Sequence, residues 1–158
     1  MAEVFYLTTT LPYVNAEPHI GFAFEIVLAD IVARYKRMTG AAVFLSTGTD
    51  EHGQKIFQKA REESRDVTEY VDFFAGRFQG LKSALDLSFD AFVRTTSLHH
   101  VSAAQALWKR CAMNGDIYKK KYRGLYCIGD EAFLRENDLI DGKCPNHAAM
   151  DLITIEEA

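Results

Sequence analysis

The beginning of the chain carries the pattern that most limits the possible folds. Residues 4–9 form a β-branched and aromatic run that predicts a buried strand. Residues 22–38 are largely apolar and are followed by Gly40, a residue favoured just past the end of a helix. Residues 42–47 predict a second buried strand. Because a strand–helix–strand unit of this length is almost always parallel and right-handed, we expect an α/β fold with a parallel sheet.

Residues 11–21 connect the first predicted strand to the helix. Pro18 restricts the backbone there, His19 stands at the start of the helix, and Gly21 allows a ligand to come close. The first amides of a helix lack backbone partners and carry positive dipole charge, which suits a phosphate group. A ring N–H beside them can donate to a phosphate oxygen whose charge grows in a transition state. The crossover therefore predicts a nucleotide site; His19 by itself is either a donor at that site or a structural histidine.

Residues 47–53 leave the second predicted strand and lead into a helix predicted over residues 54–63. Ligands of an open parallel sheet bind beyond the carboxyl ends of its strands. If the two predicted strands are neighbours, the loops over residues 11–21 and 47–53 would line the same crevice. Asp50 is then a candidate partner for a substrate ammonium group, because an opposite charge stabilises a partly desolvated carboxylate. The alternative is that Asp50 caps the helix that follows.

Three further elements are predicted before the character of the sequence changes. They are a helix over about residues 68–85 with Thr68 as its N-cap, a strand over residues 91–94, and a helix from Ser97 to about Asn114. Apolar residues at helical spacing predict the inward faces of the two helices: Val71, Phe74, Phe78, Leu81 and Leu85 in the first, and Val101, Ala104, Leu107, Trp108 and Cys111 in the second.

A different kind of module is predicted after Gly115. Residues 117–126 alternate apolar and basic side chains, and turn residues crowd positions 129–130 and 141–142, which indicates short antiparallel strands with little core. We therefore divide the chain into domains 1–115 and 116–158. Potential metal ligands recur in this module as Cys127-x2-Asp130 and Cys144-x2-His147. Two such pairs on turns predict a zinc site; the alternative is a lost site, marked by Asp130.

The composition narrows the range of partners. A hydrophobic content of 48% and a charged content of 25% are those of a globular protein. The net charge of −4 does not indicate a dedicated nucleic-acid binder, although it leaves room for a local basic strip, and we expect no DNA partner. No apolar run reaches the ~20 residues that span a bilayer, so we expect no membrane partner. Three cysteines argue against a disulfide framework and for a reducing compartment, which predicts the cytoplasm.

Several motifs together resemble one enzyme family. Pro18-His19-Ile20-Gly21 resembles the "HIGH" signature of class I aminoacyl-tRNA synthetases. Residues 11–15 (LPYVN), 47–53 (TGTDEHG) and 94–97 (RTTS) look like the methionyl type, as does the cysteine-containing hairpin after Gly115. The resemblance covers essentially the whole chain. It implies an α/β fold: a parallel Rossmann-like half-domain with a HIGH-type crossover, plus a small zinc-knuckle-like β module.

The resemblance also implies an activity and a set of site residues. Such enzymes use ATP with Mg²⁺ to convert methionine to methionyl-adenylate, and then pass the methionyl group to tRNA(Met). By position, methionine would be bound by Leu11, Tyr13 and Asp50. ATP would be bound by Asn15, His19 and Gly21, and His19 would be the catalytic residue. Zn²⁺ would be bound by Cys127, Asp130, Cys144 and His147.

Two positions depart from the family pattern. The second histidine of the signature is Phe22, and Asp130 stands where a cysteine is usual. The family's lysine-bearing "KMSKS" loop and its anticodon-binding domain are not found in these residues, so we expect an N-terminal fragment with little activity of its own. The alternatives are a nucleotidylyltransferase and a non-catalytic module that binds tRNA or protein.

Overall fold

The computed structural model describes residues 3–157, which form two compact units. The first unit extends to Leu107 and the second begins at Trp108. The division falls inside helix α4 (Leu98–Met113). The domain boundary that the sequence places after Gly115 stays a prediction.

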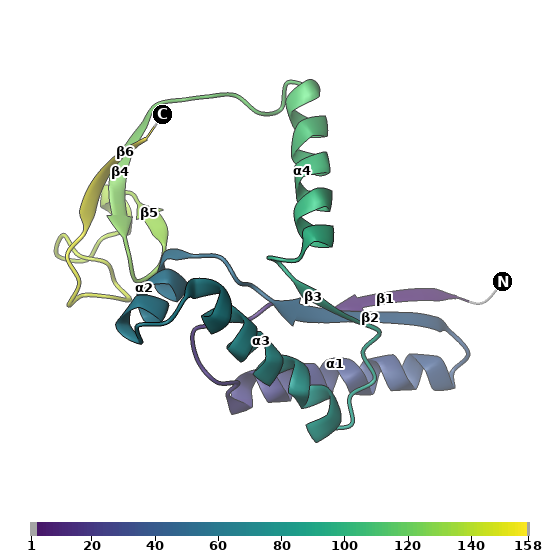
Figure 1. Ribbon diagram of the computed structural model, residues 1–158. Helices are drawn as coiled ribbons and strands as arrows, with labels where there is room; N and C mark the ends of the chain where they lie inside the picture. The colour runs from purple at the N-terminus through teal and green to yellow at the C-terminus, as the bar shows by residue number, and fades with distance from the viewer. Residues whose placement is uncertain (1–2, 158) are drawn as a thin grey trace. The chain divides into compact units, whose positions relative to one another are not determined.

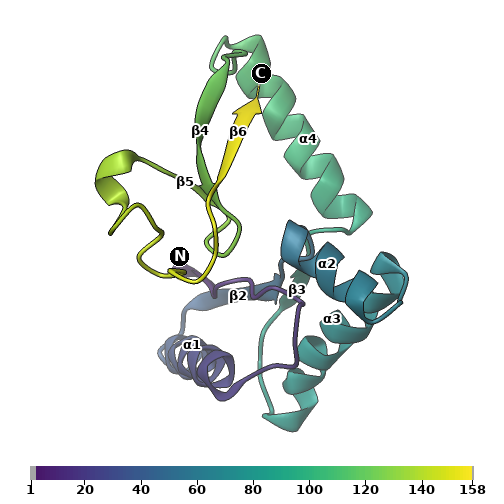
Figure 2. The same cartoon turned by 90° about the vertical axis from the view of Figure 1, so that its left-hand side faces the viewer.

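The first unit is built on a parallel sheet of β1 (Val4–Thr8), β2 (Ala42–Thr49) and β3 (Ala91–Arg94), in the order β1-β2-β3. Helix α1 (Ile20–Met38) connects β1 to β2, and helices α2 (Gln54–Glu62) and α3 (Val67–Ala84) lie between β2 and β3 in the chain. Figures 1 and 2 show α1 and α3 on the same side of the sheet. The predicted parallel α/β arrangement is confirmed.

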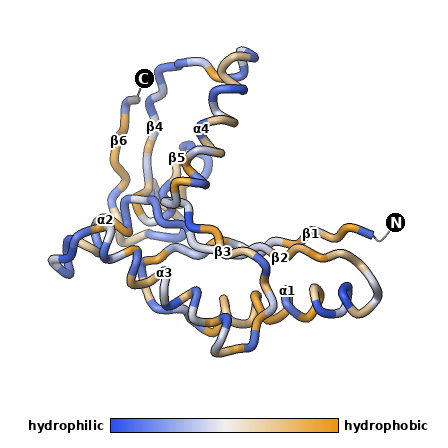
Figure 3. The backbone as a smooth tube through the Cα atoms, turned by 45° about the vertical axis from the view of Figure 1, so that its right-hand side comes forward, coloured by the Kyte–Doolittle hydropathy of each residue, from blue (hydrophilic) through white to orange (hydrophobic). Residues whose placement is uncertain are grey.

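The main core lies between the sheet and these helices. Leu45 of β2, Ile26 of α1 and Phe78 of α3 are buried there, and apolar positions recur along β2 and α1 in Figure 3. Phe22 is 4% exposed, and its ring packs edge-on against that of Phe78 at a centroid distance of 5.3 Å. The apolar face that the sequence assigns to the helix over residues 68–85 therefore packs with the largely apolar first helix in one core.

Two predictions of burial are wrong. Strand β1 was expected to be buried, but Val4 and Tyr6 are 81% and 64% exposed, because neither α1 nor α3 covers the face on which they lie. Helix α4 forms as predicted, yet none of its residues is buried, and Leu107 and Trp108 are 65% and 64% exposed. Helical periodicity identifies an apolar face but not whether another element packs on it.

The start of α3 also differs from the prediction. Asp66, not Thr68, is the N-cap, since its carboxylate accepts hydrogen bonds from the backbone N–H groups of Thr68 and Glu69. An aspartate immediately before the first helical residue satisfies these amides well, which fixes the start of α3 at Val67. At the other end, Leu85 lies past the helix and is 41% exposed.

The second unit contains an antiparallel sheet with the strand order β5-β4-β6. Its strands are β4 (Tyr122–Cys127), β5 (Ala132–Leu134) and β6 (Ile153–Glu157), with a short 3₁₀ helix η1 (Glu136–Asp138) after β5. Cys127 and Cys144 are its buried apolar residues among those described. The predicted module of short antiparallel strands with little core is confirmed.

No helix within residues 3–157 has the length and apolar character that crossing a membrane requires.

Candidate functional site

The loops that leave β1 and β2 are bonded to each other. Tyr13 and Asp50 form an isolated parallel bridge, in which the N–H of Asp50 donates to the carbonyl of Pro12 at 2.9 Å and the N–H of Val14 donates to the carbonyl of Asp50 at 3.3 Å. These bonds continue the pairing of β1 with β2 beyond the strands. The two loops therefore lie side by side at the carboxyl edge of the sheet, as the sequence predicts for neighbouring strands.

The loop after β1 is fixed to the core of the first unit. Val14 is fully buried, and the hydroxyl of the buried Tyr70 on α3 donates to the carbonyl of Asn15 at 3.1 Å. Just before this anchor in the chain, Leu11 and Tyr13 are 37% and 39% exposed. An anchored loop with partly exposed apolar side chains is suited to hold an apolar ligand group without first having to become ordered.

His19 is the N-cap of α1. Its Nδ1 accepts a hydrogen bond from the backbone N–H of Gly21 at 3.0 Å, so the proton of the neutral ring belongs on Nε2. A Cβ atom at position 21 would lie 2.9 Å from Cε1 and 3.0 Å from Nδ1 of His19. The glycine is thus required by the ring beside it. The ring in turn carries an N–H donor at the positive end of the 19-residue helix α1.

Asp50 lies on the second loop and is half-buried. Its Oδ1 accepts from the backbone N–H of His52 at 3.3 Å and lies 3.5 Å from the hydroxyl of Thr95. The N-cap of α2 is Gly53, and no side chain bonds to the cap amides. The alternative that Asp50 merely caps α2 is therefore wrong, since its carboxylate contacts its own loop and the segment after β3 instead.

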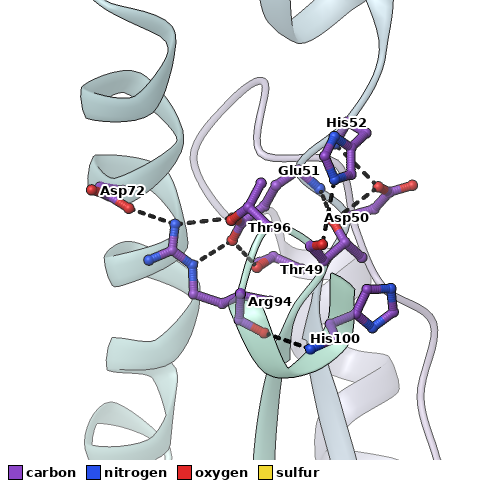
Figure 4. A network of polar contacts seen from close by, with 10 residues as sticks. Thr49, Asp50, Glu51, His52, Asp72, Arg94, Thr96 and His100 are labelled. Carbon is purple, nitrogen blue, oxygen red and sulfur yellow. Dashed lines mark hydrogen bonds and ion pairs between the residues drawn. The ribbon is translucent and has the colours of Figure 1, made fainter. Parts of the chain in front are cut away.

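Glu51 is a site residue that the sequence interpretation missed. Its side chain has no exposed area, and it accepts hydrogen bonds from Thr49, Thr96 and both Nε and Nη2 of Arg94. Figure 4 shows this network, which Arg94 extends to Asp72 of α3. Burial by itself raises the pKa of Glu51, but the hydrogen bonds outweigh burial and hold that pKa below its ordinary value. Two features of the sequence could have predicted this ion pair. Glu51 directly follows Asp50, and Arg94 ends the strand predicted over residues 91–94.

The four predicted metal ligands converge in the second unit. One ligand atom from each of Cys127, Asp130, Cys144 and His147 lies within 4.8 Å of all the others. Nδ1 of His147 is 3.8 and 3.9 Å from the two sulfur atoms and 3.1 Å from Oδ1 of Asp130, and Sγ of Cys144 is 2.9 Å from Oδ2 of Asp130. Tetrahedral zinc with ordinary bond lengths separates its ligands by roughly 3.3–3.8 Å, and the observed separations lie around this range. The residue types, two cysteines, one histidine and one carboxylate, are all ligands that zinc accepts.

Two further features of the cluster suit a cation. A Cβ atom at Gly129 would come within 2.4 Å of the ring of His147, so only glycine allows the imidazole to approach the β4–β5 turn. The hydrogen bond to the Asp130 carboxylate, together with burial, raises the pKa of the Cys144 thiol, because a second negative charge is unfavourable there. A divalent cation at the centre would neutralise these groups.

Comparison with known proteins identifies the family. The model of the family described as tRNA synthetases class I (M) matches residues 5–153. This chain belongs to that family. Methionine–tRNA ligase of Thermotoga maritima is 46% identical over 136 residues, which cover 86% of this chain and 22% of the relative. The corresponding protein of Caldanaerobacter subterraneus is 44% identical over 146 residues, which cover 92% of this chain and 23% of the relative.

A solved structure of this synthetase family has the same fold. Methionyl-tRNA synthetase of Mycobacterium tuberculosis, in complex with methionyl-adenylate, superposes with a TM-score of 0.89 at 37% identity, covering 98% of this chain and 31% of that one. The class I synthetase fold and its methionyl type, which the motifs predicted, are confirmed. The chain spans about a quarter of the length of the curated relatives it matches.

The two departures from the synthetase pattern have different consequences. Phe22 points into the core and not toward the paired loops, so at this position the chain uses the side chain for packing. Asp130 takes part in the cluster in the place where a cysteine is usual, so the cluster keeps four potential ligand atoms.

The synthetase residues predicted for ATP and methionine all lie on the two loops or at the first turn of α1. They are Leu11, Tyr13, Asn15, His19, Gly21 and Asp50. Their individual roles stay predictions.

Proposed function

We propose that this chain forms the ATP- and methionine-binding part of a methionine–tRNA ligase. The observation that carries the proposal is the pairing of the two loops, which brings the His19 N-cap and the Asp50 carboxylate to one edge of the sheet in a member of the class I synthetase family. The relatives at 44% and 46% identity are methionine–tRNA ligases, and the superposed M. tuberculosis structure holds methionyl-adenylate.

Methionine would bind through its two ends. The Asp50 carboxylate would hold the α-ammonium group, since a half-buried carboxylate is strongly stabilised by an opposite charge. The partly exposed side chains of Leu11 and Tyr13 would contact the apolar side chain of the amino acid. This arrangement leaves the carboxylate of methionine facing the first turn of α1.

ATP would bind with its phosphates at that turn, near Asn15, His19 and Gly21. A carboxylate oxygen of methionine forms a new bond to the α-phosphorus, the bond from that phosphorus to the oxygen of the β-phosphate breaks, and pyrophosphate leaves. The Nε2–H of His19 would donate to a phosphate oxygen as its negative charge grows, while Mg²⁺ bound with ATP neutralises the phosphates. No protein nucleophile takes part, so rate enhancement comes from positioning and charge stabilisation.

The second unit would hold one zinc ion through Cys127, Asp130, Cys144 and His147. There the metal would link the turn between β4 and β5 to the turn at residues 144–147 and so stabilise a sheet with little core of its own. Zinc in this place has a structural task, because all four of its positions are taken by protein ligands.

The family also suggests a partner and a compartment. We propose that the full-length protein transfers the methionyl group to tRNA(Met). None of the described cysteines, Cys111, Cys127 and Cys144, is in a disulfide, and we propose a reducing compartment such as the cytoplasm.

The test is exchange of pyrophosphate into ATP by the full-length protein that carries these residues. Exchange should require methionine and should not respond to other amino acids. His19→Ala should abolish it, and Asp50→Asn should raise the KM for methionine more than that for ATP. Asp116→Asn, which neutralises an exposed carboxylate outside the two loops, is the matched control and should leave both KM values unchanged.

Three results would contradict the proposal. Equal exchange with another amino acid would reject methionine as the substrate. Adenylyl transfer to a phosphorylated acceptor without any response to methionine would indicate a nucleotidylyltransferase. Tight tRNA binding by a protein that binds neither ATP nor methionine would indicate a non-catalytic module.

A further inference from the structure

Asp50 and Glu51 are adjacent carboxylates with opposite surroundings. Glu51 is fully buried, and each of its oxygens accepts two hydrogen bonds. Oε1 accepts from Thr49 and from Nε of Arg94, both at 2.7 Å, and Oε2 accepts from Nη2 of Arg94 at 2.9 Å and from Thr96. A carboxylate offers about four lone-pair sites, so Glu51 has none left for a substrate. Its contacts instead bind the loop after β2 to the segment after β3.

Thr95 lies in that segment, and each of its polar groups contacts the end of β2 or the loop that follows it. Its N–H donates to the carbonyl of Thr49 at 3.3 Å, and its carbonyl lies 3.3 Å from Nε2 of His52. Its hydroxyl accepts from the backbone N–H of Glu51 at 2.8 Å and lies 3.5 Å from Oδ1 of Asp50. The Thr95 oxygen accepts the bond from Glu51 through a lone pair. The hydroxyl proton therefore remains available for donation to Oδ1 of Asp50.

Arg94 connects this arrangement to the rigid part of the first unit. Besides its two bonds to Glu51, its Nη2 lies 2.6 Å from Oδ1 of Asp72, in the second turn of α3. A bidentate guanidinium–carboxylate pair fixes direction as well as distance. The segment that carries Thr95 is therefore held from both sides, by a buried carboxylate and by a helix (Figure 4).

We propose that Thr95, held in place by the Glu51–Arg94 ion pair, is a positioning residue for the carboxylate of Asp50. The inference rests on the proposed function, in which Asp50 binds the ammonium group of methionine. The Thr95 hydroxyl directs Oδ1 of Asp50, and the ammonium group binds at Oδ2. The 3.5 Å separation between the hydroxyl and Oδ1 shortens when the substrate arrives, as is common for bonds that tighten in the substrate complex.

The test is Thr95→Val in the full-length protein, which removes the hydroxyl at nearly constant volume. The KM for methionine in pyrophosphate exchange should rise about tenfold, as expected for a lost hydrogen bond to a charged group, while the KM for ATP stays within about twofold. Thr95→Ser, which keeps the hydroxyl, should restore the KM for methionine. Arg94→Lys, which keeps the charge but not the bidentate geometry, should shift the KM for methionine in the same direction as Thr95→Val.

A double variant separates positioning from general stability. If Thr95 acts through Asp50, then Asp50→Asn/Thr95→Val should be no weaker in methionine binding than Asp50→Asn alone. Thr39→Val is the matched control, because Thr39 is an exposed threonine whose hydroxyl bonds only locally at the end of α1. It should change neither KM.

The outcomes distinguish the two proposals. If the unaltered protein shows no exchange that depends on methionine, both proposals fail. If Asp50→Asn raises the KM for methionine and Thr95→Val does not, the positioning role alone is overturned. An equal rise of both KM values with a lower melting temperature would assign Thr95 a purely structural role and also overturn the inference. If Thr95→Val does not fold, Arg94→Lys replaces it in the test. Its effect on the KM for methionine is then measured alone and in combination with Asp50→Asn.

Discussion

The backbone N–H of Gly21 donates to Nδ1 of His19 at 3.0 Å, and the ring of His19 occupies the space that a side chain at position 21 would need. The two residues therefore act as one unit at the start of α1. The amide fixes which ring nitrogen carries the proton, and the missing Cβ leaves room for the ring beside residue 21. This geometry supports the proposal that a histidine and a glycine two positions apart bind a phosphate group of ATP.

Gly21→Ala should displace the His19 ring and impair catalysis. A Cβ atom at 2.9 Å from Cε1 must move the imidazole, so its Nε2–H no longer reaches the phosphate oxygen. We expect the rate of methionine-dependent exchange to fall by about 10²-fold, the effect of removing one donor to a transition-state charge. Gly80→Ala is the control, because a Cβ on that α3 glycine meets nothing within 4 Å, and it should retain full activity. Full activity of Gly21→Ala would show that the ring orientation is unimportant.

Two buried carboxylates should make the stability of the first unit depend on pH. Burial by itself raises the pKa of Asp30 and of Glu51, but hydrogen bonds from serine, threonine and arginine side chains outweigh it, so each pKa lies below its ordinary value of 3.8 or 4.5. The folded state therefore binds these protons less tightly than the unfolded chain. The resulting stabilisation is fully present above those ordinary values and is lost as the pH falls through the lower values of the folded state.

We accordingly expect the free energy of unfolding to be nearly constant from about pH 7 to pH 5 and to fall below about pH 4.5. Urea unfolding followed by circular dichroism across this range measures it. Asp30→Asn should reduce the steepness of the fall, because this carboxylate, which accepts from both the N–H and the hydroxyl of Ser88, is then absent. Glu62→Gln, a surface change on α2, should leave the curve unchanged. Identical curves for the Asp30 variant and the unaltered protein would contradict this account.

The second unit should bind zinc. Protein purified without added metal is expected to contain about one zinc ion per chain by elemental analysis, the content of a closed four-ligand site. Cys144→Ser should remove the metal, whereas Cys111→Ser, which changes the cysteine outside the cluster, should not. Asp130→Cys should bind zinc more tightly, since thiolate is the better ligand of a structural site. Absence of zinc even after addition of the metal would mean that Asp130 marks a lost site.

Several features of the candidate site could be read from the sequence because they depend on neighbours along the chain. The N-cap position of His19, the glycine two residues later and the loops after two β-branched runs are local patterns, and the structure has them in the predicted places. The spacing of Cys127 to Asp130 and of Cys144 to His147 likewise indicated two ligand pairs, which do converge.

The sequence by itself determined the order of strands and helices, since side-chain periodicity and capping chemistry act within a few residues. Only the tertiary structure decided which faces are covered and which charges meet. It left α4 and one face of β1 exposed, placed Phe22 in the core, and joined Glu51 to Arg94 across 43 positions of the chain. Burial and ion pairing depend on residues brought together by folding, and no local pattern records which of them will meet.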